Sequence, residues 1–326
     1  MSTIKFDSLA GGLTVHADWD ETILDALLRS GAAVPFYCRA GLCGQCRSIV
    51  VSGEVEDVGA SPQLLTPSQR AQGEILLCRC RAVTDCEIKP ANPIACVAAN
   101  RWPSTTAVES LRTLDGEVLH LRVKALDAEP FDFHAGQYTR FERMSGDLEL
   151  IPRLFIASTP GIPIMDFYLP QGAHTAAMQA ALEPGAKVSL TEPMGNASLR
   201  DDTADHVVII AEGAGVASAI GILHKLAITP AAPPTHLFVY SQHRDGLEQM
   251  VTELAREARA QAVVARSFGE LRETLDSGLS IIRAGSPTAK IQAYVKVGRD
   301  TAKLARESLF AHNVRPWDTH VDTIAA

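Results

Sequence analysis

Short apolar segments alternate with polar turns through the N-terminal part of the chain. Two segments near the start have the pattern of a strand pair around Gly11-Gly12. An acidic pair, Asp20-Glu21, then precedes an amphipathic segment that ends at Gly31, as is typical of a helix. The predicted elements are strands at 4–6 and 13–15, a strand and turn at 48–55, a buried strand at 75–77 and a helix at 22–29. Together they predict a small domain that mixes strands with one helix.

The middle of the chain consists of short strand-like runs. These runs are at 118–123, 138–141, 154–156, 167–169 and 187–190. Short strands at regular intervals, with turn signals between them, are typical of an antiparallel barrel. A segment with prolines near both ends, 91–103, precedes the runs and is predicted to be a linker.

From about residue 205 the pattern changes to strands that alternate with helices. The β-branched run 206–211 is continuous, as in a strand buried on both faces. A glycine turn follows, and then a helix at 218–226, a strand at 236–240 and a helix at 247–260. This alternation predicts a parallel α/β sheet. The glycines at 213 and 215 allow either the approach of a phosphate or nicotinamide, or the close packing of strand against helix, and the sequence leaves both open.

Cysteine spacing supplies the most specific chemical signal in the chain. Cys38, Cys43 and Cys46 have the spacing C-x4-C-x2-C, and Cys78 follows at the end of the apolar run 75–77. This is the arrangement of plant-type [2Fe–2S] ligands, in which one tight loop supplies three thiolates and a distant strand end supplies the fourth. The sequence therefore predicts an iron–sulfur cluster.

Two alternatives exist for these cysteines. Cys80 competes with Cys78 as fourth ligand, but Cys78 directly ends the predicted strand and is favoured. A zinc site is disfavoured because such sites usually contain two C-x2-C pairs, and here there is one. Cys80, Cys86 and Cys96 are interpreted as small buried residues.

Composition and charge exclude several classes of partner. The chain has 326 residues, enough for two or three domains, and a formal net charge of −8. An acidic protein of this kind is not expected to bind nucleic acid or an anionic membrane. We also expect no membrane span and no secretory signal, and we expect a cytoplasmic location. Seven cysteines in a reducing compartment favour metal ligation over disulfides.

Taken in order, these segments resemble the single-chain reductases of ring-hydroxylating (Rieske-type) and related multicomponent oxygenases. The N-terminal stretch is similar to plant-type ferredoxins of the β-grasp fold. Similarities further along are Phe133–Tyr138, Arg153–Ser158, Gly172–Thr175, Pro184-Gly185 and Glu192–Gly195. The resemblance implies four regions: a [2Fe–2S] ferredoxin domain at 1–92, a linker at 93–103, a flavin-binding β-barrel at 104–202 and an NAD(P)-binding-like α/β domain at 203–326.

The resemblance also implies which residues hold the cofactors. Arg153 is expected to neutralise the flavin pyrophosphate, with Leu154 beside it, and Phe155 to pack on the flavin ring. Gly172 and Thr175 occupy the turn that holds flavin phosphate in the family. The candidate nicotinamide residues are Gly213 and Gly215, and near the C-terminus His320 and Asp322 are weaker candidates for positions near the flavin. No catalytic residue is assigned.

Several positions depart from the family pattern. Phe155 replaces a tyrosine, and one residue of that motif is missing. Glu212 precedes the strand-end glycines, where an acid does not favour a pyrophosphate. Val297 stands where the family has a cysteine near the nicotinamide, and Ile324 stands where it has a terminal aromatic residue. All four changes concern one flavin–nicotinamide junction.

Two functions follow as expectations from the resemblance. The first is a reductase that passes electrons from NADH or NADPH through flavin (FAD rather than FMN) to the [2Fe–2S] cluster and on to an oxygenase or Rieske-type partner. The alternative is a non-catalytic [2Fe–2S] electron-transfer subunit with a degenerate flavin and nicotinamide module. The predicted fold is the same in both: a β-grasp domain, an antiparallel β-barrel and a parallel α/β domain.

Overall fold

The computed structural model of the chain divides into two compact units, residues 1–100 and 101–326. The structure describes residues 2–8, 11–30, 32, 34, 36, 41, 44, 46–60, 64–91, 106–114, 118–127, 130–141, 153–191, 193–195, 197–200, 204–242, 246–315 and 318–324. The predicted linker, 93–103, lies outside these residues.

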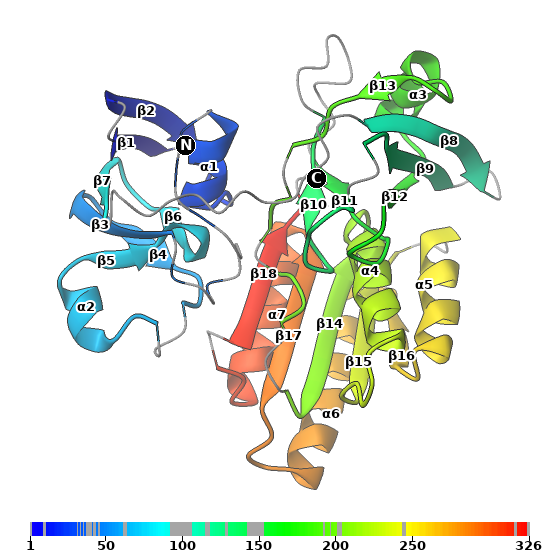
Figure 1. Cartoon of the computed structure of the whole chain (residues 1–326). Helices are drawn as coiled ribbons and strands as arrows, with labels where there is room; N and C mark the ends of the chain where they lie inside the picture. Colours follow the sequence, from blue (N-terminus) through cyan, green and yellow to red (C-terminus); the bar gives the residue numbers. More distant parts are fainter. Residues whose placement is uncertain are drawn as a thin grey trace. The chain divides into compact units, whose positions relative to one another are not determined.

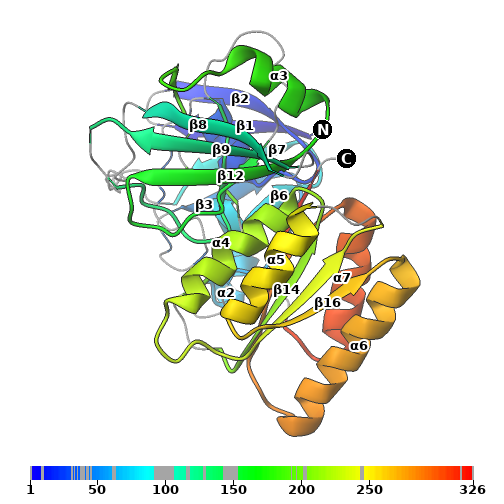
Figure 2. The same cartoon turned by 90° about the vertical axis from the view of Figure 1, so that its right-hand side faces the viewer.

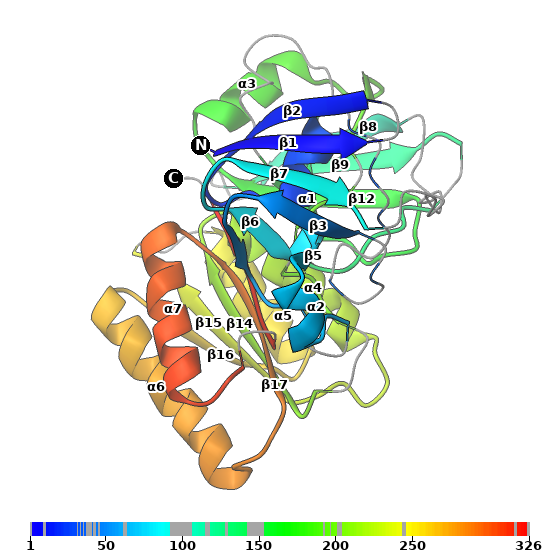
Figure 3. The same ribbon diagram turned by 90° about the vertical axis from the view of Figure 1, so that its left-hand side faces the viewer.

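The first unit contains a mixed five-stranded sheet with one helix packed against it (Figures 1 and 3). Its strand order is β2-β1-β7-β3-β5, and β1 pairs antiparallel with β2 but parallel with β7. The elements are β1 (Ser2–Ser8), β2 (Gly11–Ala17), α1 (Ile23–Arg29), β3 (Arg47–Ser52), β4 (Val55–Asp57), α2 (Pro67–Ala71), β5 (Glu74–Leu76), the 3-10 turn η1 (Leu77–Arg79), β6 (Cys80–Ala82) and β7 (Cys86–Pro90). The predicted strand pair, helix and buried strand are confirmed.

Local sequence signals account for helix α1. Thr22 precedes it in an extended conformation, and its hydroxyl accepts a hydrogen bond from the Asp25 amide at 3.2 Å. The side chains of Ile23, Leu24 and Leu27 are buried in the apolar core of the first unit. The cap defines where the helix begins, and the apolar face determines which way it packs.

The second unit begins with a four-stranded antiparallel sheet of order β12-β9-β8-β13. Its elements are β8 (Thr106–Leu114), β9 (Val118–Ala125), β12 (Ile164–Pro170) and β13 (Lys187–Val188), and a second sheet contains β10 (Tyr138–Thr139) and β11 (Leu154–Phe155). Isolated bridges Tyr138↔Met194, Phe141↔Leu190 and Ile156↔Phe167 connect the two sheets around a shared apolar core. These bridges give the strands the curved, barrel-like arrangement that the sequence predicted.

The remainder of the second unit is a parallel sheet of order β16-β15-β14-β17-β18. Its elements are β14 (His206–Glu212), α4 (Gly215–Ala227), β15 (Thr235–Tyr240), α5 (Gly246–Glu257), β16 (Gln261–Ala265), α6 (Phe268–Gly285), β17 (Ile291–Val297), α7 (Arg299–Ala311) and β18 (Thr319–Thr323). Helices α4 and α5 cover one face and α6 and α7 cover the other (Figure 2). The predicted α/β pattern is confirmed.

The central strand β14 shows why its sequence is apolar at every position. Val207 and Ile209 pack toward α4 and α5, whereas Val208 and Ile210 pack toward α6 and α7. A strand covered on both faces cannot alternate apolar with polar residues.

Helix α4 also packs against the barrel strands. His224 contacts the Ala157 carbonyl oxygen through Nδ1 at 2.8 Å, and the Ser218 hydroxyl donates to the Gly136 carbonyl at 2.9 Å. A Cβ atom on Gly221 would collide with the Ile156 carbonyl. Helix α4 is therefore the element that joins the barrel and the nucleotide-type sheet within this unit.

Several elements were not predicted from the sequence. Among them, strand β8 has an irregular polar pattern toward its end, and helix α3 (Ala173–Ala181) follows the turn that the family resemblance assigns to flavin phosphate. Among the described helices, none is both long and apolar enough to cross a membrane.

Candidate metal centre and cofactor site

The first site lies where strands β3 and β5 meet. These strands pair antiparallel, with Arg47 opposite Leu76, so Cys46 before β3 and Cys78 after β5 lie at the same edge. Their Sγ atoms are 3.3 Å apart, and neither cysteine forms a disulfide. Two thiolates on one tetrahedral metal, with bonds of about 2.3 Å, would be about 3.7 Å apart. The pair therefore fits two ligands of one iron.

Two glycines of the predicted cluster loop have left-handed backbone angles. Gly41 and Gly44 both have φ of +70°, a conformation that residues with a Cβ rarely adopt. A Cβ on Gly41 would lie 2.7 Å from the Cγ atom of the buried Arg79. Both the angle and this close contact explain why glycine stands there. Such a loop brings backbone N–H groups close to cluster sulfurs.

The other cysteines divide into two groups. Cys38 and Cys43 lie outside the described residues, so their ligand roles stay predictions. Cys80 begins β6, opposite Asp57 of β4, and burial raises the pKa of its thiol to about 12. Burial likewise raises the pKa of the Cys86 thiol to about 11. Cys78 lies beside Cys46, as a fourth ligand would, and its ligand role stays a prediction.

A second site surrounds the paired strands β10 and β11. Tyr138 and Phe155 are opposite each other in register, and their rings meet edge to face with centroids 5.7 Å apart. The buried apolar cluster around them consists of Tyr138, Phe155, Met194 and Ala217, with Tyr168, Ala214 and Ile324 packed against it. Aromatic rings in this setting offer flat apolar surfaces to a planar ring system. Phe155, predicted to pack on flavin, is in this cluster.

Arg153 lies beside the same aromatic pair. Its guanidinium carbon is 5.0 Å from the centre of the Tyr138 ring, and its Nη1 donates to the carbonyl of Thr323 at the end of β18. A planar cation next to an aromatic surface is suited to bind a pyrophosphate. Leu154, its neighbour in β11, is fully buried in the barrel core and has a packing role.

Gly172 and Thr175 begin helix α3. The Thr175 hydroxyl accepts from the Gly172 amide at 2.8 Å and lies 3.2 Å from the side-chain oxygen of Gln171. The turn is thus preformed, with its amides near the start of a helix, as phosphate binding requires. The contacts that we describe do not place these two residues against Arg153.

A buried ion pair that the sequence did not predict lies next to the aromatic cluster. Lys296 of β17 is fully buried, and its Nζ is 2.6 Å from the Asp322 carboxylate of β18. The same Nζ donates to the Gly136 carbonyl and is 5.6 Å from the centre of the Phe155 ring. Burial lowers the pKa of Lys296, and the Asp322 carboxylate opposes that shift.

Asp322 also binds the barrel side of the unit. Its Oδ2 accepts from the Ala197 amide at 3.1 Å and would lie 2.8 Å from a Cβ on Gly195. Asp322, a weaker sequence candidate, is therefore part of the junction, whereas His320 packs on Tyr294 and contacts Arg200 at 3.1 Å. One sequence signal could have found the pair: a lysine inside the apolar run of β17.

The glycines after β14 have different roles. A Cβ on Gly215 would lie 2.6 Å from Cδ1 of Ile324 and against the Lys296 carbonyl, so close packing is sufficient to explain this glycine. Gly213 has φ of +50°, and a Cβ there would meet nothing within 4 Å. Of the two, Gly213 is therefore the one that leaves open space for a ligand.

Glu212 connects the ends of the two central strands. Its carboxylate accepts from the Gly298 amide at 2.8 Å, at the residue that precedes helix α7. This bond spans β14 and β17, where the order of strands reverses. Open α/β sheets bind ligands at such a point. The acid thus stabilises the start of α7, which gives the departure at Glu212 a structural reason.

A hydrogen-bonded set of polar side chains lies next to Tyr168, beside the aromatic cluster. His120 stacks on its ring with centroids 4.7 Å apart, and Asp166 binds His120 at 2.7 Å and Arg122 at 2.7 Å. Burial raises the pKa of Asp166, but the hydrogen bonds from His120 and Arg122 outweigh it, so the net shift is downward. Asp166 therefore stays ionised and holds β9 against β12.

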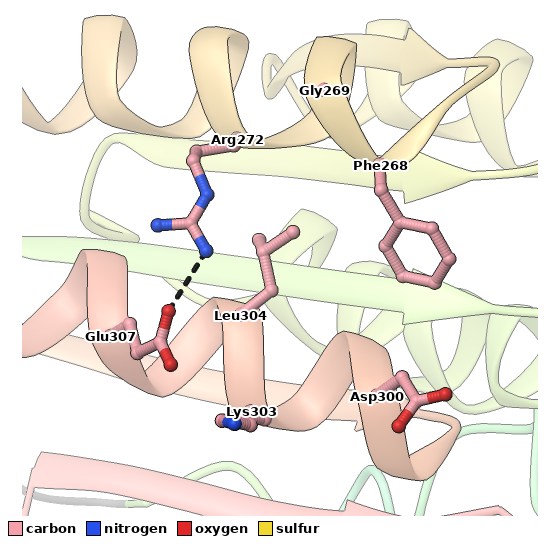
Figure 4. A pocket seen from close by; sticks show the side chains of 7 residues that line it. All are labelled: Phe268, Gly269, Arg272, Asp300, Lys303, Leu304 and Glu307. Atoms are coloured by element: carbon pink, nitrogen blue, oxygen red, sulfur yellow. Dashed lines mark hydrogen bonds and ion pairs between the residues drawn. The ribbon is translucent and has the colours of Figure 1, made fainter.

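A cavity of about 410 Å³ lies elsewhere, between helices α6 and α7 (Figure 4). It is lined by Phe268, Gly269, Arg272, Asp300, Lys303, Leu304 and Glu307. Arg272 and Glu307 form an ion pair of 2.8 Å across it, on side chains that are both 48% exposed. None of the predicted site residues lines this cavity.

Comparison with known proteins agrees with the geometry of the first site. Residues 8–83 match the family described as "2Fe-2S iron-sulfur cluster binding domain". That range contains the pair Cys46 and Cys78 as well as the predicted ligands Cys38 and Cys43. The first site therefore belongs to a cluster-binding domain.

Relatives of the chain are reductase or electron-transfer components. The propane 2-monooxygenase reductase component of Gordonia sp. (strain TY-5) is 29% identical over 233 residues, covering 67% of this chain and 64% of that protein. The toluate 1,2-dioxygenase electron transfer component of Pseudomonas putida is 27% identical over 245 residues, covering 72% and 70%. The chain thus spans about two thirds of the length of the first of these relatives.

Solved structures show the fold of the whole chain. The ferredoxin reductase in carbazole 1,9a-dioxygenase superposes with a TM-score of 0.61 at 21% identity, covering 99% of this chain and 98% of that one. Its FAD apo form gives a TM-score of 0.58 at 22% identity. The chain therefore has a fused architecture, in which a [2Fe–2S] ferredoxin domain of the β-grasp fold is joined to a module with the fold of a ferredoxin reductase.

Proposed function

We propose that this protein is an oxidoreductase that takes electrons from NADH, passes them through FAD to its [2Fe–2S] cluster and delivers them to an oxygenase or Rieske-type protein. The observation that carries the proposal is the approach of Cys46 and Cys78 to 3.3 Å in a chain that also has the ferredoxin-reductase fold. A flavin held by the second unit would supply the conversion of paired electrons to single ones, which neither nicotinamide nor cluster performs alone.

The residues of the chain have separate tasks in this proposal. Cys38, Cys43, Cys46 and Cys78 hold the cluster. Arg153 pairs with the flavin pyrophosphate, and Thr175, whose hydroxyl accepts from the Gly172 amide and so holds the turn in place, donates its hydroxyl proton to flavin phosphate.

The aromatic cluster orients the ring system of the flavin. Tyr138 and Phe155 are both buried, and they would present flat surfaces to the ring system once it takes the place of side chains that now pack on them. Phe155 lacks a hydroxyl, but stacking needs only the ring. The donor set present in this junction therefore fits a flavin.

Gly213 leaves room at the carboxyl edge of the parallel sheet for the nicotinamide nucleotide. Hydride transfer requires mainly that the two rings be close and correctly oriented. The Lys296–Asp322 pair and helix α4 hold the barrel and this sheet in one arrangement.

We propose the boundaries 1–92, 93–103, 104–202 and 203–326 for the four regions of the chain, and a cytoplasmic location for the protein.

A second candidate function is a non-catalytic [2Fe–2S] electron-transfer subunit whose reductase module no longer turns over. It is favoured by Glu212, which binds Gly298 at the strand-order reversal where the nicotinamide nucleotide would pass. In that case the [2Fe–2S] cluster alone would transfer electrons.

Cofactor content and an anaerobic titration with NADH distinguish the two functions. The reductase should contain about one flavin per two irons, and NADH should bleach the flavin bands near 370 and 450 nm and then the cluster absorption. Iron-replete protein without flavin, and without reduction by NADH or NADPH, would support the non-catalytic subunit instead.

A further inference from the structure

A charged pair lies at the carboxyl edge of the parallel sheet, away from the flavin junction. Arg266 directly follows β16, and its guanidinium binds both carboxylate oxygens of Glu248 in helix α5, at 2.5 and 2.7 Å. It also donates to the Ser241 carbonyl, directly after β15, at 3.1 Å. The pair therefore joins segments that follow two neighbouring strands, β15 and β16.

The Glu248–Arg266 pair lies near the place where the ribose of a bound nicotinamide nucleotide is expected. Strand β14 carries the glycine turn, β15 is its neighbour, and the last pair in register between β15 and β16 is Tyr240 with Ala265. In doubly wound sheets the ribose of a dinucleotide lies beyond the end of the strand next to the glycine turn. Groups that follow Tyr240 and Ala265 are thus placed near that ribose.

The chemistry of the pair discriminates between the two nicotinamide cofactors. NADPH differs from NADH by a 2′-phosphate, which an arginine accommodates and a carboxylate repels. Here both carboxylate oxygens occupy the guanidinium in the two-bond geometry that Arg otherwise uses for phosphate. Glu248 is only 12% exposed, so its charge is weakly screened by solvent.

We propose that the Glu248–Arg266 pair makes this protein select NADH over NADPH, because Glu248 withholds the guanidinium that would otherwise bind the 2′-phosphate. The inference rests on the proposed function. Arg266 is 35% exposed, so it is within reach of a ligand once its partner is neutral.

The test compares Glu248→Gln with the double variant Glu248→Gln/Arg266→Gln. Glu248→Gln keeps the size of the side chain but removes its charge. The ratio of kcat/KM for NADPH to that for NADH should rise about tenfold or more, as for one charge-assisted hydrogen bond to phosphate. In the double variant the gain should vanish, because the released guanidinium is gone.

Binding of NADP⁺ and NAD⁺ to the same variants, measured by calorimetry, provides a readout independent of turnover. Glu257→Gln, an exposed acid on the same helix, is the matched control and should leave both cofactors unaffected. A pair that only holds the loops together would lower both efficiencies in parallel, and that result would overturn the inference. A gain that persists in the double variant would also overturn it.

The outcome also separates this inference from the proposed function. If the wild type oxidises NADH but Glu248→Gln leaves the ratio of kcat/KM for NADPH to that for NADH unchanged, the reductase function stands and the inference about cofactor selection is wrong. If the wild type neither binds nor oxidises NADH or NADPH, both the proposed function and the inference are wrong.

Discussion

At the scale of single residues, side chains far apart in sequence acquire their chemistry from what folding places beside them. Cys78 acquires a partner thiol because β3 and β5 pair. Arg153 acquires an aromatic neighbour, Tyr138, and a carbonyl at the end of β18. Spacing predicted Cys78 and the family resemblance implied Arg153, but only the fold shows what each of them touches.

Replacing Cys78 and Cys80 separately tests which one is the fourth ligand. Cys78→Ser should lose the iron content and the EPR signal of the reduced cluster, because a serine oxygen is a poorer iron ligand than a thiolate. Cys80→Ser should retain both, since Cys80 lies in β6 opposite Asp57. Iron analysis and EPR of the dithionite-reduced proteins provide the measurement. The opposite result would exchange the two assignments.

Replacing Arg153 tests its role in flavin binding. Arg153→Ala should weaken flavin binding by about tenfold or more, because a charged hydrogen bond to phosphate contributes about 1.5–3 kcal/mol. Flavin per iron after desalting is the measurement, with the exposed Arg112→Ala in β8 as control. Unchanged flavin content in Arg153→Ala would contradict the pyrophosphate assignment.

At the scale of elements, the barrel strands and the parallel sheet are held together by a few specific contacts. Helix α4 contributes two of them through Ser218 and His224. Lys296 and Asp322 contribute a third, which connects β17 and β18 to the turn at Gly136 and the segment at Ala197. The flavin junction is therefore built between elements, and no single element contains it.

Removing one partner of the buried pair should be costly. Lys296→Met leaves the Asp322 carboxylate buried without the compensating charge of Lys296, which costs about 3–5 kcal/mol in the free energy of unfolding. Lys296→Met/Asp322→Asn removes both charges and keeps an acceptor for the Ala197 amide, so it should recover most of that loss.

Urea unfolding of the wild type and these variants provides the measurement for the buried pair. A single variant as stable as the wild type, or a double variant less stable than the single one, would show that the charges are not coupled as the 2.6 Å contact implies.

At the scale of the whole molecule, two compact units have separate redox tasks in the proposed function. The first unit contains the cluster-binding domain, and the second has the barrel and the parallel sheet. The electron path therefore crosses from one unit to the other, and it can be interrupted at the cluster without removing the flavin.

A cluster-deficient variant tests this path. Cys46→Ser should lose NADH-driven reduction of cytochrome c, which accepts single electrons from the cluster, and keep NADH-driven reduction of ferricyanide, which can accept them from flavin. Flavin content measured in parallel shows that the second unit is still intact. Cytochrome c reduction at the wild-type rate without a cluster would contradict the proposed order of carriers.

The sequence by itself determined the order of the domain folds along the chain and the type of iron–sulfur cluster, because these depend on local periodicity and on short cysteine spacings. An apolar run such as 206–211 predicts a strand covered on both faces, and C-x4-C-x2-C predicts an iron–sulfur loop, without knowledge of distant partners.

Only the tertiary structure decided which distant groups meet. The Lys296–Asp322 pair, the bond from Gly298 to Glu212, the packing reason for Gly215 and the pair Glu248–Arg266 each join segments from different elements. Contacts of this kind depend on strand order and on which helix covers which face. One sequence carries no direct record of either, because local residue preferences are the same whatever the distant partner is.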